Sequence, residues 1–308
     1  MDIEYLLILQ ELREAAGPLA EQFFLMVSNV LVGAIMTAVS FIVYWCLDKR
    51  KGLFVLTSFS VGTLVNNLVK SIACVPRPWL CDARITPSEA ALPGATGYSF
   101  PSGHTQSAMS VYGAAGWSGR DKSRLLPVLG GVMVALVAFS RNFLGVHTPQ
   151  DVLVAILEAT IIMALAERAV PWLEEADDTR AFHVLDAGAI ITLAYLALCT
   201  FKPYPEGEVP LGMLLDAYEA AGLFLGVVTG WWLERRYVRF SVEGSRREKI
   251  ARVVVGVVIV VIARYGVAAP LGEVFGETWK DFLKALLPII AGMAGVPMLF
   301  PFIHSKLG

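Results

Sequence analysis

Eight residues in the first half of the chain have types and spacings suited to phosphate chemistry. They are Lys70, Arg77, Ser102, Gly103, His104, Arg141, His147 and Asp151. Three of them are cations, and the guanidinium groups of Arg77 and Arg141 match phosphate oxygens in pairs. Gly103 has no side chain, so an oxygen could approach its backbone N–H at the start of an expected helix. His104 and His147 could act as general acid and nucleophile.

Long apolar segments must position these residues. The chain has 308 residues, of which 56% are hydrophobic and 17% charged, and its mean hydropathy is +0.62. Soluble domains have about a quarter charged residues, so the composition excludes an ordinary soluble enzyme and a disordered protein. The net charge of −2 indicates no nucleic-acid partner. The sequence therefore predicts an integral membrane protein with several spans.

We predict an all-α membrane bundle with about nine transmembrane helices. Their apolar segments are 23–47, 53–72, 104–118, 125–143, 149–165, 181–200, 209–233, 250–267 and 282–302. A spanning helix needs about 20 apolar residues. Segment 104–118 is short and partly polar, but it is included because the basic loop 119–124 would otherwise lie on the wrong side. Loops of one side hold 15 Lys and Arg residues against 7 on the other, which predicts an outside N-terminus and an inside C-terminus.

This topology brings the eight residues to the outer membrane face. Lys70 closes the second span, residues 102–104 open the third, Arg141 ends the fourth, and His147 and Asp151 lie at the start of the fifth. Each residue also has an ordinary structural interpretation, such as an interfacial anchor or a helix cap. A coincidence of all eight at one face is improbable. We therefore expect a phosphate-binding site there.

Three motifs resemble the signature of the type 2 phosphatidic acid phosphatase superfamily. They read Lys70-(six residues)-Arg77-Pro78, Pro101-Ser102-Gly103-His104 and Ser140-Arg141-(five residues)-His147-(three residues)-Asp151. The resemblance covers roughly residues 20–172, and the last four predicted spans lie outside it. The predicted layout is similar to that of the glucose 6-phosphatase and sphingosine 1-phosphate phosphatase branches.

The resemblance implies a role for each motif residue. His147 would attack phosphorus and form a phosphohistidine, Asp151 would orient the His147 ring, and His104 would protonate the leaving group and then activate water. The other five, Lys70, Arg77, Ser102, Gly103 and Arg141, would hold the phosphoryl oxygens. The resemblance implies no metal and no cofactor.

Five further charged residues are expected inside the membrane. They are Glu158, Asp216, Glu219, Arg264 and Lys284. Buried ionisable groups pair with one another or line a cavity, and the sequence leaves open whether these five form structural ion pairs or a cavity wall. Gly222, Gly226 and Gly230 recur at intervals of four, a spacing that favours close packing of membrane helices.

The chain is expected to have three regions. They are an interfacial amphipathic helix at 1–18, a phosphatase core at 19–172 and an additional four-helix membrane region at 173–308. The sequence does not decide whether Cys74 and Cys81 form a disulfide, or whether the chain forms a homo-oligomer. The leading function is hydrolysis of a lipid phosphate or diphosphate at the extracytoplasmic face, with phosphorylated lipid and membrane lipids as partners. The alternatives are a phosphotransferase, a phosphatase of a small soluble ester, and a transporter.

Overall fold

A computed structural model describes residues 2–205, 207 and 210–307, and within this part it is helical without strands. Residues 1, 209 and 308, which belong to the expected segments 1–18, 209–233 and 173–308, lie outside the described part. The elements are α1 Asp2–Val32, α2 Ala34–Ile42, η1 Val43–Leu47, α3 Lys49–Ala73, α4 Pro78–Cys81, η2 Glu89–Gly94, α5 Gly103–Ala108, η3 Met109–Gly113, α6 Ala114–Ser118, α7 Leu125–Phe143, α8 Pro149–Glu174, α9 Asp178–Phe201, α10 Leu211–Leu233, η4 Glu234–Val238, α11 Arg246–Val261, η5 Ile262–Ala268, α12 Ala269–Phe275, α13 Glu277–Ile290, η6 Ala291–Gly295, η7 Pro297–Leu299 and α14 Phe300–Leu307.

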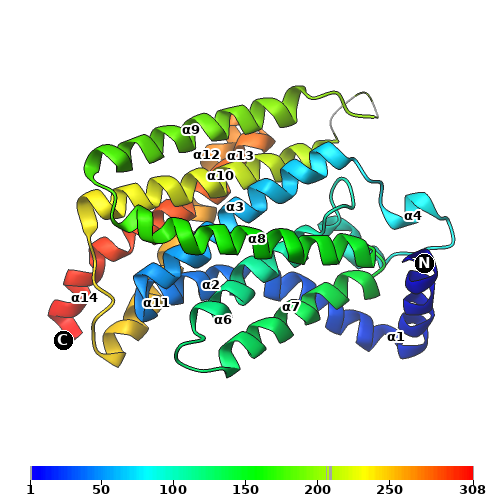
Figure 1. Cartoon of the computed structure of the whole chain (residues 1–308), viewed down its shortest axis with the longest axis horizontal. Helices are drawn as coiled ribbons and strands as arrows, with labels where there is room; N and C mark the ends of the chain where they lie inside the picture. Colours follow the sequence, from blue (N-terminus) through cyan, green and yellow to red (C-terminus); the bar gives the residue numbers. More distant parts are fainter. Residues whose placement is uncertain (1, 206, 208–209, 308) are drawn as a thin grey trace.

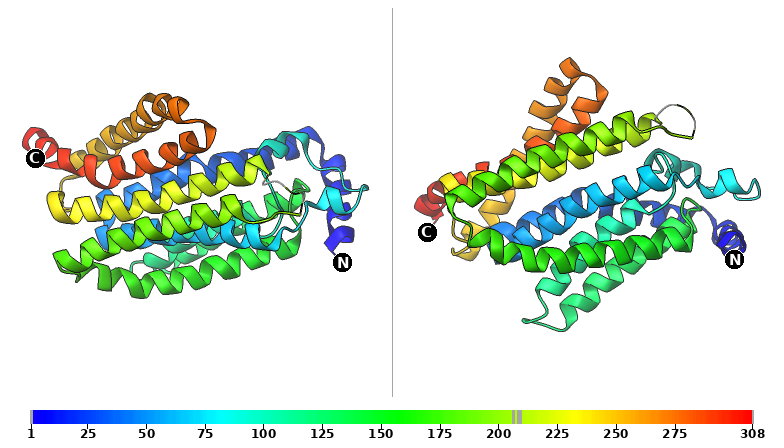
Figure 2. Two further views of the ribbon diagram at one scale, coloured as in Figure 1. Left: turned by 90° about the horizontal axis from the view of Figure 1, so that it is seen from above. Right: turned by 45° about the horizontal axis from the view of Figure 1, so that its top comes forward.

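The long helices run along one common axis (Figure 1). Helix α3 packs against α8 on one side and α10 on the other, and α10 also packs against α9. The two ends of the chain lie at opposite ends of this axis in all views (Figures 1 and 2). The prediction of an all-α bundle is therefore confirmed.

Seven helical segments in the described part are long and apolar enough to cross a membrane. They are Asp2–Leu47, Lys49–Cys81, Leu125–Phe143, Asp178–Phe201, Leu211–Val238, Arg246–Phe275 and Glu277–Leu307. The other two expected spans are α8, which lies alongside α3, and segment 104–118, which is divided among α5, η3 and α6. An integral membrane bundle follows from the seven, whereas the count of nine stays a prediction.

The first helix is kinked near residue 17. Gly17 has a φ of 77° and precedes Pro18, which removes a backbone donor and interrupts the helix. The preceding turns stand across the end of the bundle (Figure 2). Leu9 is buried there, whereas Ile8 and Leu12 are 64% and 51% exposed. The expected apolar face is thus only partly covered by protein.

The glycines of α10 allow close contact with α13. A Cβ at Gly226 would lie 3.1 Å from the Leu286 carbonyl oxygen, and one at Gly230 would lie 2.8 Å from Cβ of Met293. A Cβ at Gly222 would collide with the Phe282 carbonyl oxygen. The predicted close packing along this stripe is confirmed, since small residues let two backbones approach.

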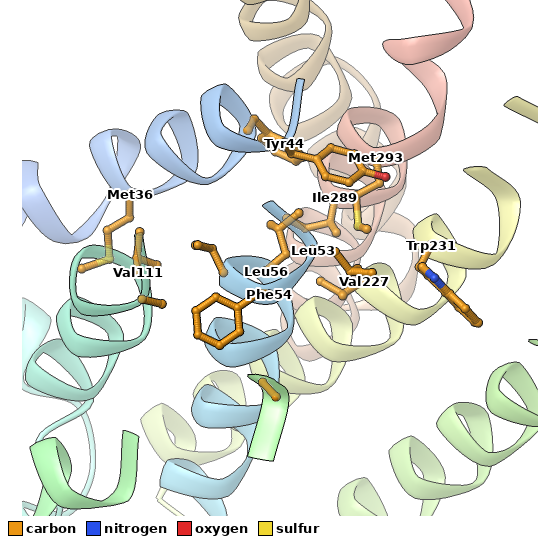
Figure 3. Close-up of a cluster of buried hydrophobic side chains, with 14 of the residues drawn as sticks. Met36, Tyr44, Leu53, Phe54, Leu56, Val111, Val227, Trp231, Ile289 and Met293 are labelled. Atoms are coloured by element: carbon orange, nitrogen blue, oxygen red, sulfur yellow. The ribbon is translucent and has the colours of Figure 1, made fainter. Parts of the chain in front are cut away.

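An apolar core joins the first and last helices. Figure 3 shows Tyr44 of η1 beside Met293 of η6 and Ile289 of α13, with side chains of α3 below them. The indole N–H of Trp45 donates to the carbonyl of Gly292 over 2.8 Å. The additional C-terminal helices therefore pack directly onto the helices that carry the candidate site.

Candidate active site

The predicted site residues come from helix ends that meet at one end of the bundle. Helix α3 ends at Ala73, shortly after Lys70, and its cap residue Cys74 has a φ of 49° and donates its N–H to the Lys70 carbonyl over 3.1 Å. Helix α8 begins with a capping box, in which the side chains of Thr148 and Asp151 each accept the other residue's backbone N–H. Pro149 occupies the first helical position, where its missing N–H costs nothing.

His147 is held by two neighbours with opposite hydrogen-bonding roles. Its Nδ1 lies 3.2 Å from Oδ2 of Asp151, and its Nε2 lies 3.0 Å from Nη1 of Arg77. A carboxylate accepts and a guanidinium only donates. The pair therefore selects the tautomer with a proton on Nδ1 and a lone pair on Nε2.

The surroundings keep this imidazole neutral. His147 is 2% exposed, and this burial, together with the nearby cations Arg77, Arg141 and Lys70, holds the pKa of His147 well below its usual 6.5. Both causes disfavour a charged ring. Nε2 thus carries an available electron pair at neutral pH.

His147 lines a cavity of about 800 Å³. At this end its wall includes Lys70, Arg77, Gly103, His104 and His147. The two cationic side chains could bind an anion, and the two histidines face the same space. Such a wall can bind a phosphoryl group next to a nucleophile and a proton donor.

Three predicted site residues lie behind the wall. The Ser102 hydroxyl is 3.0 Å from that of Thr105, and the Ser102 N–H donates to the Asp151 carbonyl over 3.0 Å. Arg141 is 1% exposed and donates to Ser28 and Gly94, and its Nε has no partner among the described residues. Asp151 lies behind His147. The structure therefore separates residues that face the cavity from residues that support them.

The five intramembrane charges divide in a similar way. Asp216, Glu219, Arg264 and Lys284 line the cavity. Arg264 also approaches Glu219 to 3.6 Å, and Lys284 pairs with Asp281 over 3.0 Å. Glu158 is absent from the wall and accepts from Asn66 over 3.1 Å. Whether these charges act as cavity wall or as structural ion pairs stays a prediction: Arg264 and Glu219 line the cavity and also approach each other, whereas Lys284 pairs within its own helix.

Sequence reasoning missed several supporting residues. The Ser99 hydroxyl donates to Asp151 over 2.5 Å, and the Asn142 amide donates to the His147 carbonyl over 2.8 Å. Arg77 donates to the carbonyls of Thr96 and Gly97 over 2.5 and 3.0 Å. Asn142 directly follows a motif residue, so its position was a usable signal. Loop 94–100 carried no comparable signal.

The two cysteines that flank Arg77 are free. Cys74 donates to the Ser71 carbonyl over 3.1 Å and accepts from Lys202, and Cys81 is exposed. The disulfide that the sequence left open is therefore not formed in this structure.

Comparisons with known proteins agree with the motifs. Residues 51–175 match the PAP2 superfamily, and residues 218–306 match the transmembrane extension of PAP2 superfamily phosphatases. Lipid phosphate phosphatase delta of Arabidopsis thaliana is 22% identical over 97% of this chain and 72% of its own length. Phosphatidylglycerophosphatase B of Bacillus subtilis is 29% identical over 47% of this chain and 67% of its own. No solved structure matches the chain significantly.

Proposed function

The chain belongs to the PAP2 superfamily, and we propose that it hydrolyses a lipid phosphate or diphosphate monoester through a phosphohistidine intermediate. The two relatives named above are phosphatases by name, one of lipid phosphates. We further propose nine membrane crossings, an interfacial helix over residues 2–16, and an active site at the extracytoplasmic face. The excess of Lys and Arg in the loops at the opposite end supports that orientation.

The observation that carries the proposal is the environment of His147. The tautomer leaves a lone pair on Nε2, the residue lines a cavity that also has Lys70 and Arg77 in its wall, and Asp151 contacts Nδ1 at 3.2 Å. A neutral imidazole with its other nitrogen bound to a carboxylate is an effective nucleophile.

In the first step, the Nε2 lone pair of His147 forms a bond to phosphorus. Arg77, whose N–H donates a hydrogen bond to this nitrogen in the free enzyme, donates it to a phosphoryl oxygen instead. The bond between phosphorus and the lipid oxygen breaks, and His104 passes to that oxygen the proton that a phosphate monoanion brings into the site. Asp151 stabilises the positive charge that develops on the His147 ring.

In the second step, His104 takes a proton from water, and the resulting hydroxide attacks phosphorus. The bond between Nε2 and phosphorus breaks, and its electron pair returns to His147. Lys70, Arg77 and the Gly103 N–H stabilise the phosphoryl oxygens in both steps, while Arg141 and Ser102 support the wall from behind. The sum is one ester and one water consumed, and one alcohol and one phosphate released.

These cationic groups would stabilise the negative charge on the phosphoryl oxygens, as a divalent metal does in metal-dependent phosphatases. We therefore propose metal-independent hydrolysis. Phosphate release from a lipid phosphate should be unchanged by chelators. Loss of activity on chelation, with recovery in magnesium, would contradict this part of the proposal.

Trapping the covalent intermediate tests the mechanism. The variants His104→Ala and His147→Ala are each treated with an aryl phosphate that carries a labelled phosphoryl group. An aryl leaving group needs little protonation, so His104→Ala can still be phosphorylated, but it activates water poorly. We expect an acid-labile and base-stable label to accumulate on His104→Ala, and no label on His147→Ala.

Asp151→Asn serves as the graded control. It keeps the shape of the site but loses the charge that supports the imidazolium, so its labelling rate should fall between the other two. All three variants should unfold at similar temperatures to the wild type. Equal labelling of His147→Ala and His104→Ala would show that His147 is not the nucleophile.

A further inference from the structure

The cavity extends well beyond the polar residues at its outer end. It continues between α2 with η1 on one side and α11 on the other. Ile35, Phe41 and Trp45 line it from α2 and η1, and Val253, Val257 and Val261 line it from α11. We name this part the α2–α11 groove. These six side chains are apolar, and Thr37 of α2 is a polar but uncharged neighbour in the same wall, so the named groove residues include no cation that would bind a second phosphate.

Polarity changes along the length of the groove. Arg264 and Glu219 lie nearer the outer end, where Lys70 and Arg77 also face the cavity. The numbering of α11 runs outward, so Val261, Val257 and Val253 lie progressively deeper than Arg264. Trp45 lines the inner end, and its indole N–H is already bound to the Gly292 carbonyl. The cavity therefore has a charged outer end and an apolar inner end.

The length of the groove corresponds to one leaflet of a bilayer. Ile35 and Trp45 are ten residues apart on continuous helix, which is about 15 Å at 1.5 Å per residue. The hydrocarbon core of a membrane is about 30 Å thick, so one leaflet accounts for about 15 Å. Ile35 follows Ser28, which contacts Arg141, by seven residues or about 10 Å, so an alkyl chain must extend more than about 10 Å from the cationic end to enter the groove.

The groove also reaches the outer surface of the bundle. Ile35, Val257 and Val261 are 37%, 43% and 48% exposed although they line the cavity. In Figure 2, α12 and the adjoining ends of α11 and α13 project from the other helices. An alkyl chain could thus enter sideways from the membrane without leaving an apolar environment.

We propose that the α2–α11 groove binds one alkyl chain of the phosphorylated substrate, and this inference rests on the proposed function. The C-terminal extension would then take part in substrate binding, because α11 forms one of the two walls of the groove. Charge complementarity fixes the direction of the lipid, with phosphate at Lys70 and Arg77 and the chain toward Trp45. Substrate preference should then depend on alkyl length.

Neighbouring positions on α11 provide a matched test. Val257 lines the groove and is 43% exposed, whereas Val258 is 52% exposed and is not part of the cavity wall. Val257→Trp should fill the groove, and Val258→Trp should add the same ring to the other face of the same helix. Ile35→Trp fills the groove from the opposite wall, which guards against a folding defect peculiar to α11.

The measurement is kcat/KM of the purified full chain for alkyl monophosphates of increasing length in mixed micelles. For the wild type, kcat/KM should rise with length by up to about fourfold for each methylene that enters the groove. Val257→Trp and Ile35→Trp should lower kcat/KM for the longest substrates by at least about tenfold, since they exclude several methylenes. The shortest substrate should be unaffected in both, and Val258→Trp should follow the wild type throughout.

The outcomes separate this inference from the proposed function. A wild type that hydrolyses every length equally well, or a Val257→Trp variant with an unchanged length profile, would overturn the groove while leaving the phosphatase activity intact. Equal loss in Val257→Trp and Val258→Trp would also overturn it. A wild type that releases phosphate from none of the esters would refute the proposed function itself.

Discussion

At the residue scale, the imidazole of His147 is the centre of the candidate site. His147 has a carboxylate acceptor at Nδ1 and a guanidinium donor at Nε2, and both neighbours are themselves fixed by other bonds. Ser99 and the Thr148 N–H hold Asp151, while backbone carbonyls hold Arg77. Both ring nitrogens therefore have a fixed partner, which limits rotation of the His147 ring; the proposed attack would benefit from this fixed orientation.

The lowered pKa of His147 leads to a prediction about acid pH. Protonation of Nε2 removes the nucleophile, and a pKa below 6.5 means that this protonation requires a lower pH than in free histidine. For an activated aryl phosphate, kcat/KM corrected for substrate ionisation should therefore stay level as the pH falls through 6.5. The activity should be lost only at lower pH. A corrected acid limb centred at or above 6.5 would contradict the neutral, buried ring.

At the scale of elements, the start of α10 supports the active-site loop. Asp216 accepts from the Thr96 hydroxyl over 2.6 Å, and the Thr96 carbonyl accepts from Arg77 over 2.5 Å. Gly97 has a φ of 53°, and a Cβ there would collide with Met213 of α10. A helix of the C-terminal extension thus holds the loop that holds Arg77, and Arg77 in turn contacts His147.

Asp216→Asn should therefore slow catalysis without unfolding the chain. It replaces a charge-assisted hydrogen bond with a neutral one, and we expect kcat to fall about fivefold. Asp281→Asn is the matched control, because Asp281 pairs with Lys284 and lies outside the cavity wall. Kinetics and thermal unfolding of both variants check the prediction. Equal effects on kcat in the two variants would show that Asp216 does not act through Thr96 and Arg77.

On the scale of the whole molecule, one end of the bundle holds the candidate site and the other end holds most of the basic loop residues. The candidate site, the loop before α5 and the start of α8 lie at one end, and most loop Lys and Arg residues lie at the other. This separation of catalytic and basic ends underlies the proposed orientation in the membrane.

Sided labelling tests that orientation. Glu89 and Ser123 are both exposed and belong to opposite ends. In a Cys81→Ser background, which removes the exposed native thiol, Glu89→Cys should react with a membrane-impermeant thiol reagent in intact cells. Ser123→Cys should react only after the cells are opened. The reverse pattern would place the active site on the cytoplasmic side.

Much of the site followed from the order of residues along the chain. Consecutive helices that cross a bundle in alternating directions bring the end of one and the start of the next to the same side. The motifs at the ends of α3 and α7 and at the starts of α5 and α8 therefore lie at one end of the bundle. The cap at Thr148 and the glycine stripe of α10 are local patterns, and local patterns are encoded within a few residues. For this reason the helical class, the motif residues and the close packing of α10 were predictable.

Other features depend on which distant segments pack together, and no spacing in the sequence encodes that choice. Arg141 and Ser102 belong to the motifs as clearly as Arg77, yet they lie behind the cavity wall, because side-chain direction is fixed by the neighbours of each helix end. Thr96 and Ser99 act through partners 120 and 52 residues away. The partner of the glycine stripe and the apolar groove between α2 and α11 likewise exist only once the C-terminal helices pack against the first ones.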